Sequence, residues 1–394
     1  MASTENIDIN YLREFLHEHS IRSKYYVEYL GFRSNHLCHA AVALYELKAS
    51  KEYFHSYLNH YQKRLEAKEN SPTHHSQKDA DLDSLGVPEL LGRRKNYYQI
   101  LEHFDSLTTG SDPLSWEELV KREFTELALG IAGSAFHPLI HIGYGIAIED
   151  SPSICEGLAY LHHSYLPISE SLGPSVETFG QGDRSFPTIL TDVRQDMCLN
   201  NWLKETKNSV EFAEPGVGQF QQALIQLFKH KSQEVLGYAE HLQLPGDLPP
   251  ATLMTWVLEQ ILIVYTGSTP RNDFFLLHGI TSCWALRNIV PLLTPSKLKQ
   301  ILRYYVVALI STYLACGCPT INMDLVEKVP DVEHTEWKDI KKKMFQIPVE
   351  QLDEHILKVV HICNELKSSV AADASVFKRA CLCSMDFPLS FNGP

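Results

Sequence analysis

The spacing of apolar residues is the feature that most limits the folds open to this chain. Apolar side chains recur mostly at steps of three and four residues, and the strict alternation that marks a half-buried strand is scarce. The pattern therefore predicts an all-α protein with many helices. The expected helices cover residues 7–30, 34–49, 88–105, 115–136, 219–240, 251–266, 272–292, 296–314 and 347–368.

Polar segments, several of them rich in proline and glycine, separate the expected helices. Long loops are expected over residues 66–85, 167–187, 243–250 and 316–345. No repeat at a fixed period is visible, which argues against a solenoid. With 394 residues, of which 44% are hydrophobic, the chain can bury a sizeable core. We expect one large multi-helix domain over residues 1–394.

The charge balance and the termini restrict the partners. A formal net charge of −13 disfavours generic binding to nucleic acid or to anionic lipid, and no long basic run occurs. The first residues, MASTENIDIN, lack the basic and apolar regions of a signal peptide, and the most apolar stretches are shorter than the ~18–20 residues that span a bilayer. Nine cysteines without a secretion signal indicate free thiols. We expect a cytoplasmic protein that binds neither membrane nor nucleic acid.

Four of the expected helices carry histidine in apolar surroundings. The segment NHLCHAAVALYELK, residues 35–48, is charged only near its end, so a helix there is buried on most sides. His36, His39 and Ala43 share one stripe of that helix. Two histidines beside a small residue on a buried stripe indicate the wall of a pocket.

The segment HPLIHIGYG, residues 137–145, combines two rings with a proline and two glycines. His137, His141 and Tyr144 fall on one face of a helix. Pro138 lacks an N–H and crowds the preceding turn, so the helix is expected to start afresh or kink beside His137. The glycines would let another group approach the backbone closely. The stretch fits a ligand cavity or, alternatively, a pair of hydrogen-bonded core histidines.

The later histidines differ in how strongly they indicate a site. His278 lies among apolar neighbours, where a hydrogen-bonded core histidine is the simpler interpretation. His355 lies at the edge of the apolar face of its expected helix, whereas His361 points to the polar side. Lys358 is close enough to His355 for their side chains to meet. Periodicity alone favours a Lys358 that reaches to solvent.

Buried neutral imidazoles suggest metal binding, because histidine is the commonest metal ligand and such sites suit iron, zinc or copper. Without a metal, protonated rings in one buried cluster would repel each other. The sequence contains no G-x-G-x-x-G, P-loop, G-x-S-x-G or H-E-x-x-H motif. Glu14 and His17 fit the E-x-x-H spacing of di-iron proteins but lie in a charged segment that is expected at the surface.

Four blocks of the sequence together resemble the questin oxidase-like family. They are NHLCHAAVALYELKAS, FHPLIHIGYGIAIE with EGLAYLHHSY, DFFLLHGITS and DEHILKVV, in that order between residues 35 and 360. FHPLIHIGYG and the late H-x-x-K are specific in combination. The resemblance implies an O2-dependent oxidoreductase, a monooxygenase or dioxygenase, that opens a ring of an anthraquinone-type polyketide in a Baeyer–Villiger-like oxidation.

The resemblance also implies a mononuclear non-haem Fe(II) site in the helical core. The ligand candidates that it transfers are His36 or His39, His137 or His141, His278, His355 and Lys358. An ammonium cannot bind a cation, whereas a Lys358 amine that has captured CO2 would be an anionic carbamate ligand. Tyr144 is expected to donate a hydrogen bond to a substrate oxygen.

The expected reactants are a small quinone or phenolic substrate and O2, and an external reductant such as NADPH would have to bind without a recognisable fold signature. Two alternatives use the same residues. One is a metal-dependent hydrolase in which zinc activates water, although no adjacent His–Asp pair occurs. The other is a catalytically inactive helical scaffold whose histidines are structural.

Overall fold

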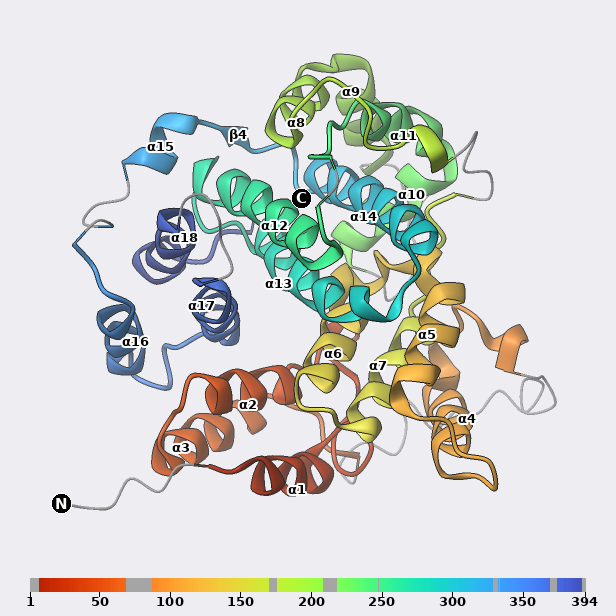
Figure 1. The fold of residues 1–394 in the computed structure, drawn as a ribbon, viewed down its shortest axis with the longest axis vertical. Helices are drawn as coiled ribbons and strands as arrows, with labels where there is room; N and C mark the ends of the chain where they lie inside the picture. Colours follow the sequence, from red (N-terminus) through yellow and green to blue (C-terminus); the bar gives the residue numbers. More distant parts are fainter. Residues whose placement is uncertain are drawn as a thin grey trace.

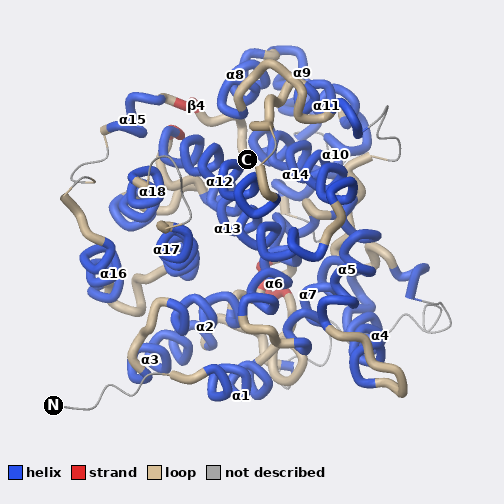
Figure 2. The backbone as a smooth tube through the Cα atoms, in the orientation of Figure 1, coloured by secondary structure: helices blue, strands red, loops and turns tan. Residues whose placement is uncertain are grey.

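The computed structural model describes residues 7–68, 87–169, 176–207, 218–246, 248–328, 332, 334–368 and 374–391. Within these residues it contains eighteen α-helices and two short strand pairs (Figure 1; Figure 2), which confirms the all-α class. The helices are α1 (Ile9–His19), α2 (Leu37–Glu46), α3 (Lys51–Gln62), α4 (Tyr97–Thr109), α5 (Trp116–Leu127), α6 (His137–Ala147), α7 (Ser151–His163), α8 (Phe186–Gln195), α9 (Met197–Lys207), α10 (Gln219–His230), α11 (Ser232–Glu240), α12 (Pro250–Gly267), α13 (Phe274–Ile289), α14 (Pro295–Ala315), α15 (Met323–Glu327), α16 (Trp337–Gln346), α17 (Glu354–Leu366) and α18 (Ser375–Asp386). The antiparallel strand pairs are β1 (Glu28–Tyr29) with β2 (Arg33–Ser34), and β3 (Ser268–Thr269) with β4 (Thr320–Ile321).

The first helix is shorter than expected. The helix expected over residues 7–30 ends at His19, and Ser20 already has extended backbone. The following residues, YYVEY, are aromatic and β-branched types that favour strands. The chain then reverses in the hairpin of β1 and β2, where Gly31 has a φ of +86° that glycine adopts without strain.

Two other expected helices are interrupted. The helix expected over residues 115–136 ends at Leu127 and continues as short 3-10 turns. The helix expected over residues 219–240 divides at Lys231 into α10 and α11. Periodicity did not reveal these breaks because the apolar stripe continues across both of them.

The expected loops are only partly loops. α8 begins inside the expected loop 167–187, and α15 and most of α16 occupy the expected loop 316–345. The expected loop 243–250 does connect two helices, α11 and α12. Helices α3, α7, α9 and α18 lie in segments for which no element is expected. Most of the expected loop 66–85, and residues 170–175, lie outside the described residues.

Four helices from distant parts of the chain form a closed ring. α2 packs on α6, α6 on α13, α13 on α17, and α17 on α2. Figure 1 shows α17, drawn in blue, close to α2, drawn in orange-red, so segments near the two ends of the chain lie side by side. α7 packs against α6, and α12 packs against α13. The main hydrophobic core includes residues from Ile7 to Cys383 and so extends through all of these helices.

The two glycines of α6 serve helix packing. A Cβ atom at Gly143 would lie 2.4 Å from the Cβ of Ala285 on α13. A Cβ atom at Gly145 would lie 2.9 Å from the side chain of Ile154 on α7. Atoms in packed interiors do not approach so closely, so these glycines allow the three helices to come together. The interpretation of the glycines as room for a ligand is therefore wrong.

Gly143→Ala is expected to lower the free energy of unfolding by about 1–3 kcal/mol, because the new methyl group forces α6 and α13 apart. The gain in helix propensity, about 1 kcal/mol at most, is smaller. Gly237→Ala on α11 is the matched control, because a Cβ atom there meets nothing within 4 Å. Urea denaturation measures both variants. Equal stability of the two would contradict the close packing at Gly143.

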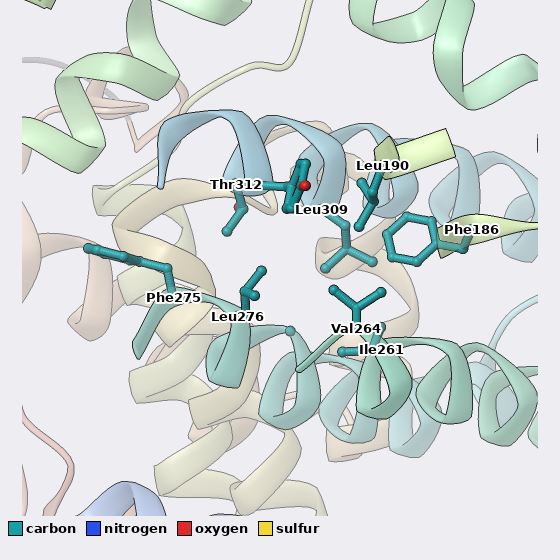
Figure 3. A pocket seen from close by; sticks show the side chains of 10 residues that line it. Phe186, Leu190, Ile261, Val264, Phe275, Leu276, Leu309 and Thr312 are labelled. Atoms are coloured by element: carbon teal, nitrogen blue, oxygen red, sulfur yellow. The ribbon is translucent and has the colours of Figure 1, made fainter. Parts of the chain in front are cut away.

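A small cavity of about 20 Å³ lies between α8, α12, α13 and α14 (Figure 3). Apolar side chains such as Leu190, Ile261, Leu276 and Leu309 surround it. A space of this size holds about one water molecule. It is therefore a gap in the packing and has no room for an organic substrate.

Several smaller expectations can be compared with the structure. No helix within the described ranges combines the length and apolar character needed to cross a membrane. All nine cysteines are free thiols, as expected, and all but Cys198 are buried. The sequence has two C-x-C pairs, Cys316/Cys318 and Cys381/Cys383, and neither belongs to a group that could hold a metal in the described part of the chain. Glu14 and His17 are exposed, which confirms their assignment to the surface.

Candidate metal centre

Four histidines, one from each of the helices α2, α6, α13 and α17, lie close together inside the ring. His36 is the N-cap residue of α2, His137 is the first residue of α6, His278 lies in the second turn of α13, and His355 lies in the first turn of α17. Their ring centroids are 4.6 Å apart for His36–His137 and His137–His278, 4.8 Å for His36–His355, and 5.0 Å for His278–His355. All four side chains are buried. We call these four residues the four-histidine cluster.

Hydrogen bonds fix two of these rings with their free nitrogens facing each other. Nδ1 of His137 donates to the carbonyl oxygen of Ser134, and Nδ1 of His278 donates to that of Phe274 at 2.7 Å. A neutral imidazole carries one N–H, so both Nε2 atoms bear lone pairs. These two Nε2 atoms lie 3.1 Å apart. Two lone pairs at this distance repel each other unless a cation or a shared proton lies between them.

His355 is oriented by a carboxylate. Its Nδ1 lies 2.7 Å from Oδ1 of Asp353, which also caps α17 by accepting the backbone N–H of His355 at 2.8 Å. Nε2 of His355 is buried and has no hydrogen-bond partner among the described residues. A carboxylate behind an imidazole is a common outer partner of a metal-bound histidine. One nitrogen from each of His36, His137 and His355 lies within 4.8 Å of the others, a grouping that could hold a metal ion.

Lys358 adds a buried amine to the cluster. Its Nζ lies 3.4 Å from Nδ1 of His36, and 0% of the residue is exposed, so the interpretation of a lysine that reaches to solvent is wrong. Burial lowers the pKa of Lys358 to about 8, against the opposing effect of Glu354 and Asp353. Glu354 places a carboxylate oxygen 3.6 Å from Nδ1 of His36. The amine therefore loses its proton more readily than an exposed lysine does.

The cluster disfavours positive charge on its own rings. Burial, followed by the charge of Lys358, lowers the pKa of His36 well below its usual value and that of His137 to about 3. Burial and the neighbouring rings lower the pKa of His278 well below its usual value as well. The positive ends of the dipoles of α2, α6 and α17 also lie here. The rings of His36, His137 and His278 are therefore neutral, which is the form that binds a metal ion, and a negative ligand would be stabilised beside them.

The structure distinguishes the two members of each histidine doublet, by which we mean His36 with His39 and His137 with His141. His36 and His137 belong to the four-histidine cluster. His39 and His141 form a layer beside it, with ring centroids 5.1 Å apart, and His141 faces the buried Glu156 at 3.3 Å. Neither ring nitrogen of His39 has a hydrogen-bond partner in the described structure. His39 and His141 therefore lie outside the closest group of potential ligands.

Tyr144 and His361 have different surroundings from those expected. Tyr144 is fully buried, its hydroxyl lies 3.4 Å from Nδ1 of His361, and its ring stacks on His39 and packs on Trp284. It does not line the cavity of about 930 Å³ beside His36, and the expected contact with a substrate oxygen stays a prediction. The assignment of His361 to the polar side is wrong, because Trp284 of α13 covers it and only 2% of it is exposed.

A cavity of about 930 Å³ reaches the cluster, and His36, His137 and His355 form part of its wall. Its volume lies in the range of sites that take small organic ligands. Phe274 connects the cavity to the cluster, because its ring contacts those of His278 and His355 at centroid distances of 4.5 and 4.9 Å. The aromatic residues of the wall are Tyr29, Phe32, Phe220, Phe274, Phe275 and Phe391. Such a wall suits a planar apolar ligand.

Sequence reasoning missed the turn that leads into His137. Ser134, Ala135 and Phe136 have φ values of 45°, 52° and 65°, a left-handed conformation that costs non-glycine residues about 1–2 kcal/mol each. No glycine or asparagine marks the turn, so the sequence carries no signal for it. The break beside Pro138 is confirmed, since α6 begins at His137.

The fold and the site together define a helical protein with a buried, histidine-rich candidate metal centre below an aromatic cavity. The chain belongs to the questin oxidase-like family, whose sequence model matches residues 33–363 and so includes the whole cluster and Lys358. This match confirms the resemblance read from the four sequence blocks.

Two fungal proteins are similar to this chain over much of its length. Baeyer-Villiger oxidase ptaJ of Pestalotiopsis fici is 25% identical over 293 residues, which cover 68% of this chain and 61% of the relative. Baeyer-Villiger oxidase GME11358 of Pestalotiopsis microspora is 21% identical over 264 residues, which cover 61% of this chain and 56% of the relative. The similarity thus spans less than two thirds of the length of either relative.

Proposed function

We propose that this chain is a non-haem iron-dependent oxidase that opens a ring of a quinone or phenolic aromatic substrate by oxidative cleavage of a carbon–carbon bond. Family membership supports oxidoreductase chemistry, and both relatives are named Baeyer-Villiger oxidases. The observation that carries the proposal is the approach of the unprotonated Nε2 atoms of His137 and His278 to 3.1 Å. A buried group of such nitrogens has the chemistry of a transition-metal ligand set.

The residues of the four-histidine cluster fit a divalent iron ion. Neutral imidazoles suit Fe(II), and the outer acceptors Ser134, Phe274 and Asp353 hold three of the rings by their Nδ1 atoms. His36, His137, His278 and His355 would therefore hold the ion. Bound iron would supply the activation of O2.

Lys358 is proposed to supply the negative ligand that a set of histidine rings lacks. The amine is buried beside His36 and cannot bind a cation as an ammonium. Its nitrogen lone pair would form a bond to the carbon of CO2 as one C=O π bond breaks and its electrons move to oxygen. The N–H proton would pass to water, which leaves a carbamate anion. The positive ends of the nearby helix dipoles would stabilise this negative charge.

The large cavity is proposed to hold the aromatic substrate beside the cluster, in contact with its aromatic wall. In a Baeyer–Villiger-type oxidation, one oxygen atom of O2 enters the bond between a carbonyl carbon and its ring neighbour, which gives a lactone. Addition of water would then open the lactone to the acid. The second oxygen atom becomes water and needs two electrons and two protons. A reduced substrate or an external reductant such as NADPH would supply them.

Anaerobic purification followed by elemental analysis tests the proposal. About one iron per chain is expected, together with O2 uptake that depends on a reduced hydroxyanthraquinone. Bound zinc without O2 uptake would indicate the hydrolase instead. A protein that holds no metal, even after incubation with Fe(II), would indicate the inactive scaffold.

Phe32→Ser is expected to raise KM for the aromatic substrate about tenfold with little change in kcat, because a wall contact is lost equally from the bound substrate and the transition state. Phe32 lines the cavity and is 54% exposed, so the fold does not depend on it. Met323→Ser is the control, since Met323 is 51% exposed and lies outside the cavity wall. Steady-state kinetics measures both variants, and an unchanged KM in Phe32→Ser would place the substrate elsewhere.

A further inference from the structure

The three residues before His137 adopt a backbone conformation that such residues rarely adopt. Ser134, Ala135 and Phe136 are all left-handed, and all three are buried. Strain of this kind persists only where the surrounding structure imposes it, and it is concentrated at functional sites. The turn leads directly into His137, so contacts that hold the turn also determine where the ring of His137 lies.

A buried carboxylate holds this turn in place. The hydroxyl of Ser134 donates to Oε1 of Glu28 at 3.0 Å and accepts from Nη2 of Arg94 at 2.9 Å. Arg94 forms an ion pair with Glu28 at 3.3 Å, and the hydroxyl of Tyr160 donates to Glu28 at 2.9 Å. Burial raises the pKa of Glu28, but His163, Arg94 and Tyr160 outweigh burial and lower it to about 2. Glu28 is therefore ionised at neutral pH and accepts hydrogen bonds from both hydroxyl groups.

The same serine links the carboxylate to the candidate ligand. The hydroxyl of Ser134 binds Glu28, whereas its backbone carbonyl accepts the Nδ1–H of His137. The position of that carbonyl fixes both the tautomer and the direction of the ring. Without the hydrogen bond from the Ser134 hydroxyl to Glu28, the strained turn can relax, and the carbonyl of Ser134 moves with it.

We propose that Glu28 is a positioning residue for His137. It holds Ser134, and through it the left-handed turn, so that Nε2 of His137 faces the four-histidine cluster. This inference rests on the proposed metal centre. Removal of the carboxylate is expected to weaken metal binding while the fold remains. If the strain in the turn is reduced, loss of the carboxylate should weaken metal binding less.

Anaerobic titration of the purified full chain with Co(II) tests the inference, with the dissociation constant and the visible absorption bands as readouts. Glu28→Gln is expected to weaken Co(II) binding about tenfold or more and to shift the bands. Glycine adopts the left-handed conformation without strain. In an Ala135→Gly background, Glu28→Gln is therefore expected to weaken binding by about threefold or less, a coupling that a double-mutant cycle measures.

Glu240→Gln is the matched control, because it removes a carboxylate 2.6 Å from the buried Arg303 and leaves the turn untouched. Its Co(II) affinity is expected to equal that of the wild type. An unchanged affinity in Glu28→Gln, or an equal loss in both backgrounds, would overturn the inference. If Glu28→Gln does not fold, Ser134→Ala replaces it with the same expected coupling, because it removes the hydroxyl and keeps the carbonyl.

His137→Ala distinguishes failure of this inference from failure of the metal centre. Wild-type Co(II) binding in His137→Ala would overturn the metal centre itself. Loss of binding in His137→Ala, with full binding in Glu28→Gln, would overturn only the role of Glu28.

Discussion

Replacing His137 with alanine is expected to leave a folded chain that no longer retains a metal ion. The ring of His137 contacts those of His36 and His278, and its Nε2 lies 3.1 Å from that of His278. Loss of an outer partner of a metal ligand weakens binding about 10–100-fold, and loss of the ligand itself should cost more. Ring-opening activity should fall to background. Metal content after purification, and O2 uptake with the aromatic substrate, measure the effect.

His361→Ala is the matched control for this experiment. His361 is also a buried histidine, with 2% of its surface exposed, but it contacts Tyr144 and Trp284 and no ring of the cluster. Both variants lose one buried imidazole, so both should unfold at a lower temperature than the wild type. Only His137→Ala should lose the metal. Full metal content in His137→Ala would exclude the proposed site.

Two variants of Lys358 are expected to show that a negative charge at this position, and not only a long side chain, supports iron binding. Lys358→Ala should lose at least about nine tenths of the bound iron and nearly all activity, because the proposed carbamate ligand cannot form. Lys358→Glu should retain part of both, since its carboxylate can replace the carbamate. Iron analysis and O2 uptake measure this order, and intact-mass analysis under CO2 looks for the added group. Wild-type activity in Lys358→Ala would exclude a role for this residue as a ligand.

The metal-free protein provides a second readout for Lys358. Burial lowers its pKa from 10.5 to about 8, so the unfolded chain binds this proton more tightly than the folded chain does. The metal-free wild type is therefore expected to gain stability as pH rises from 8 to 10.5, by on the order of 3 kcal/mol in total. Lys358→Ala should lack this gain. Thermal unfolding in EDTA at several pH values measures the difference.

Much of the site could be predicted from helical periodicity and from the family resemblance. The apolar surroundings of His36, His137, His278 and His355 mark their helices as buried, and burial of several histidines points to metal chemistry. Which histidine of each doublet lies in the four-histidine cluster depends on where its helix begins, and the sequence did not settle this. His36 is the N-cap of α2 and His137 begins α6, so both rings lie at helix ends, whereas His39 lies one turn inside α2.

Other parts of the site could not be predicted, because no pattern in the amino-acid sequence indicates them. The left-handed turn at Ser134 contains no residue that prefers this conformation, so only tertiary contacts explain it. The inward position of Lys358 contradicts periodicity, because the neighbouring helices cover the side of α17 on which it lies. Asp353 could have been found, since an aspartate before a helix is a capping signal. α7 also has such a signal, with Asp150 as its N-cap and a proline at its start.

The closed ring of helices has a consequence for how the protein matures. His36 and Lys358 contact each other across 322 positions of sequence, and α17 is the last of the four helices to be synthesised. A nascent chain on the ribosome therefore cannot assemble the complete set of candidate ligands until α17 has emerged. An ion held by the proposed metal centre would therefore bind only after α17 has been synthesised, and it would then link α2 to α17.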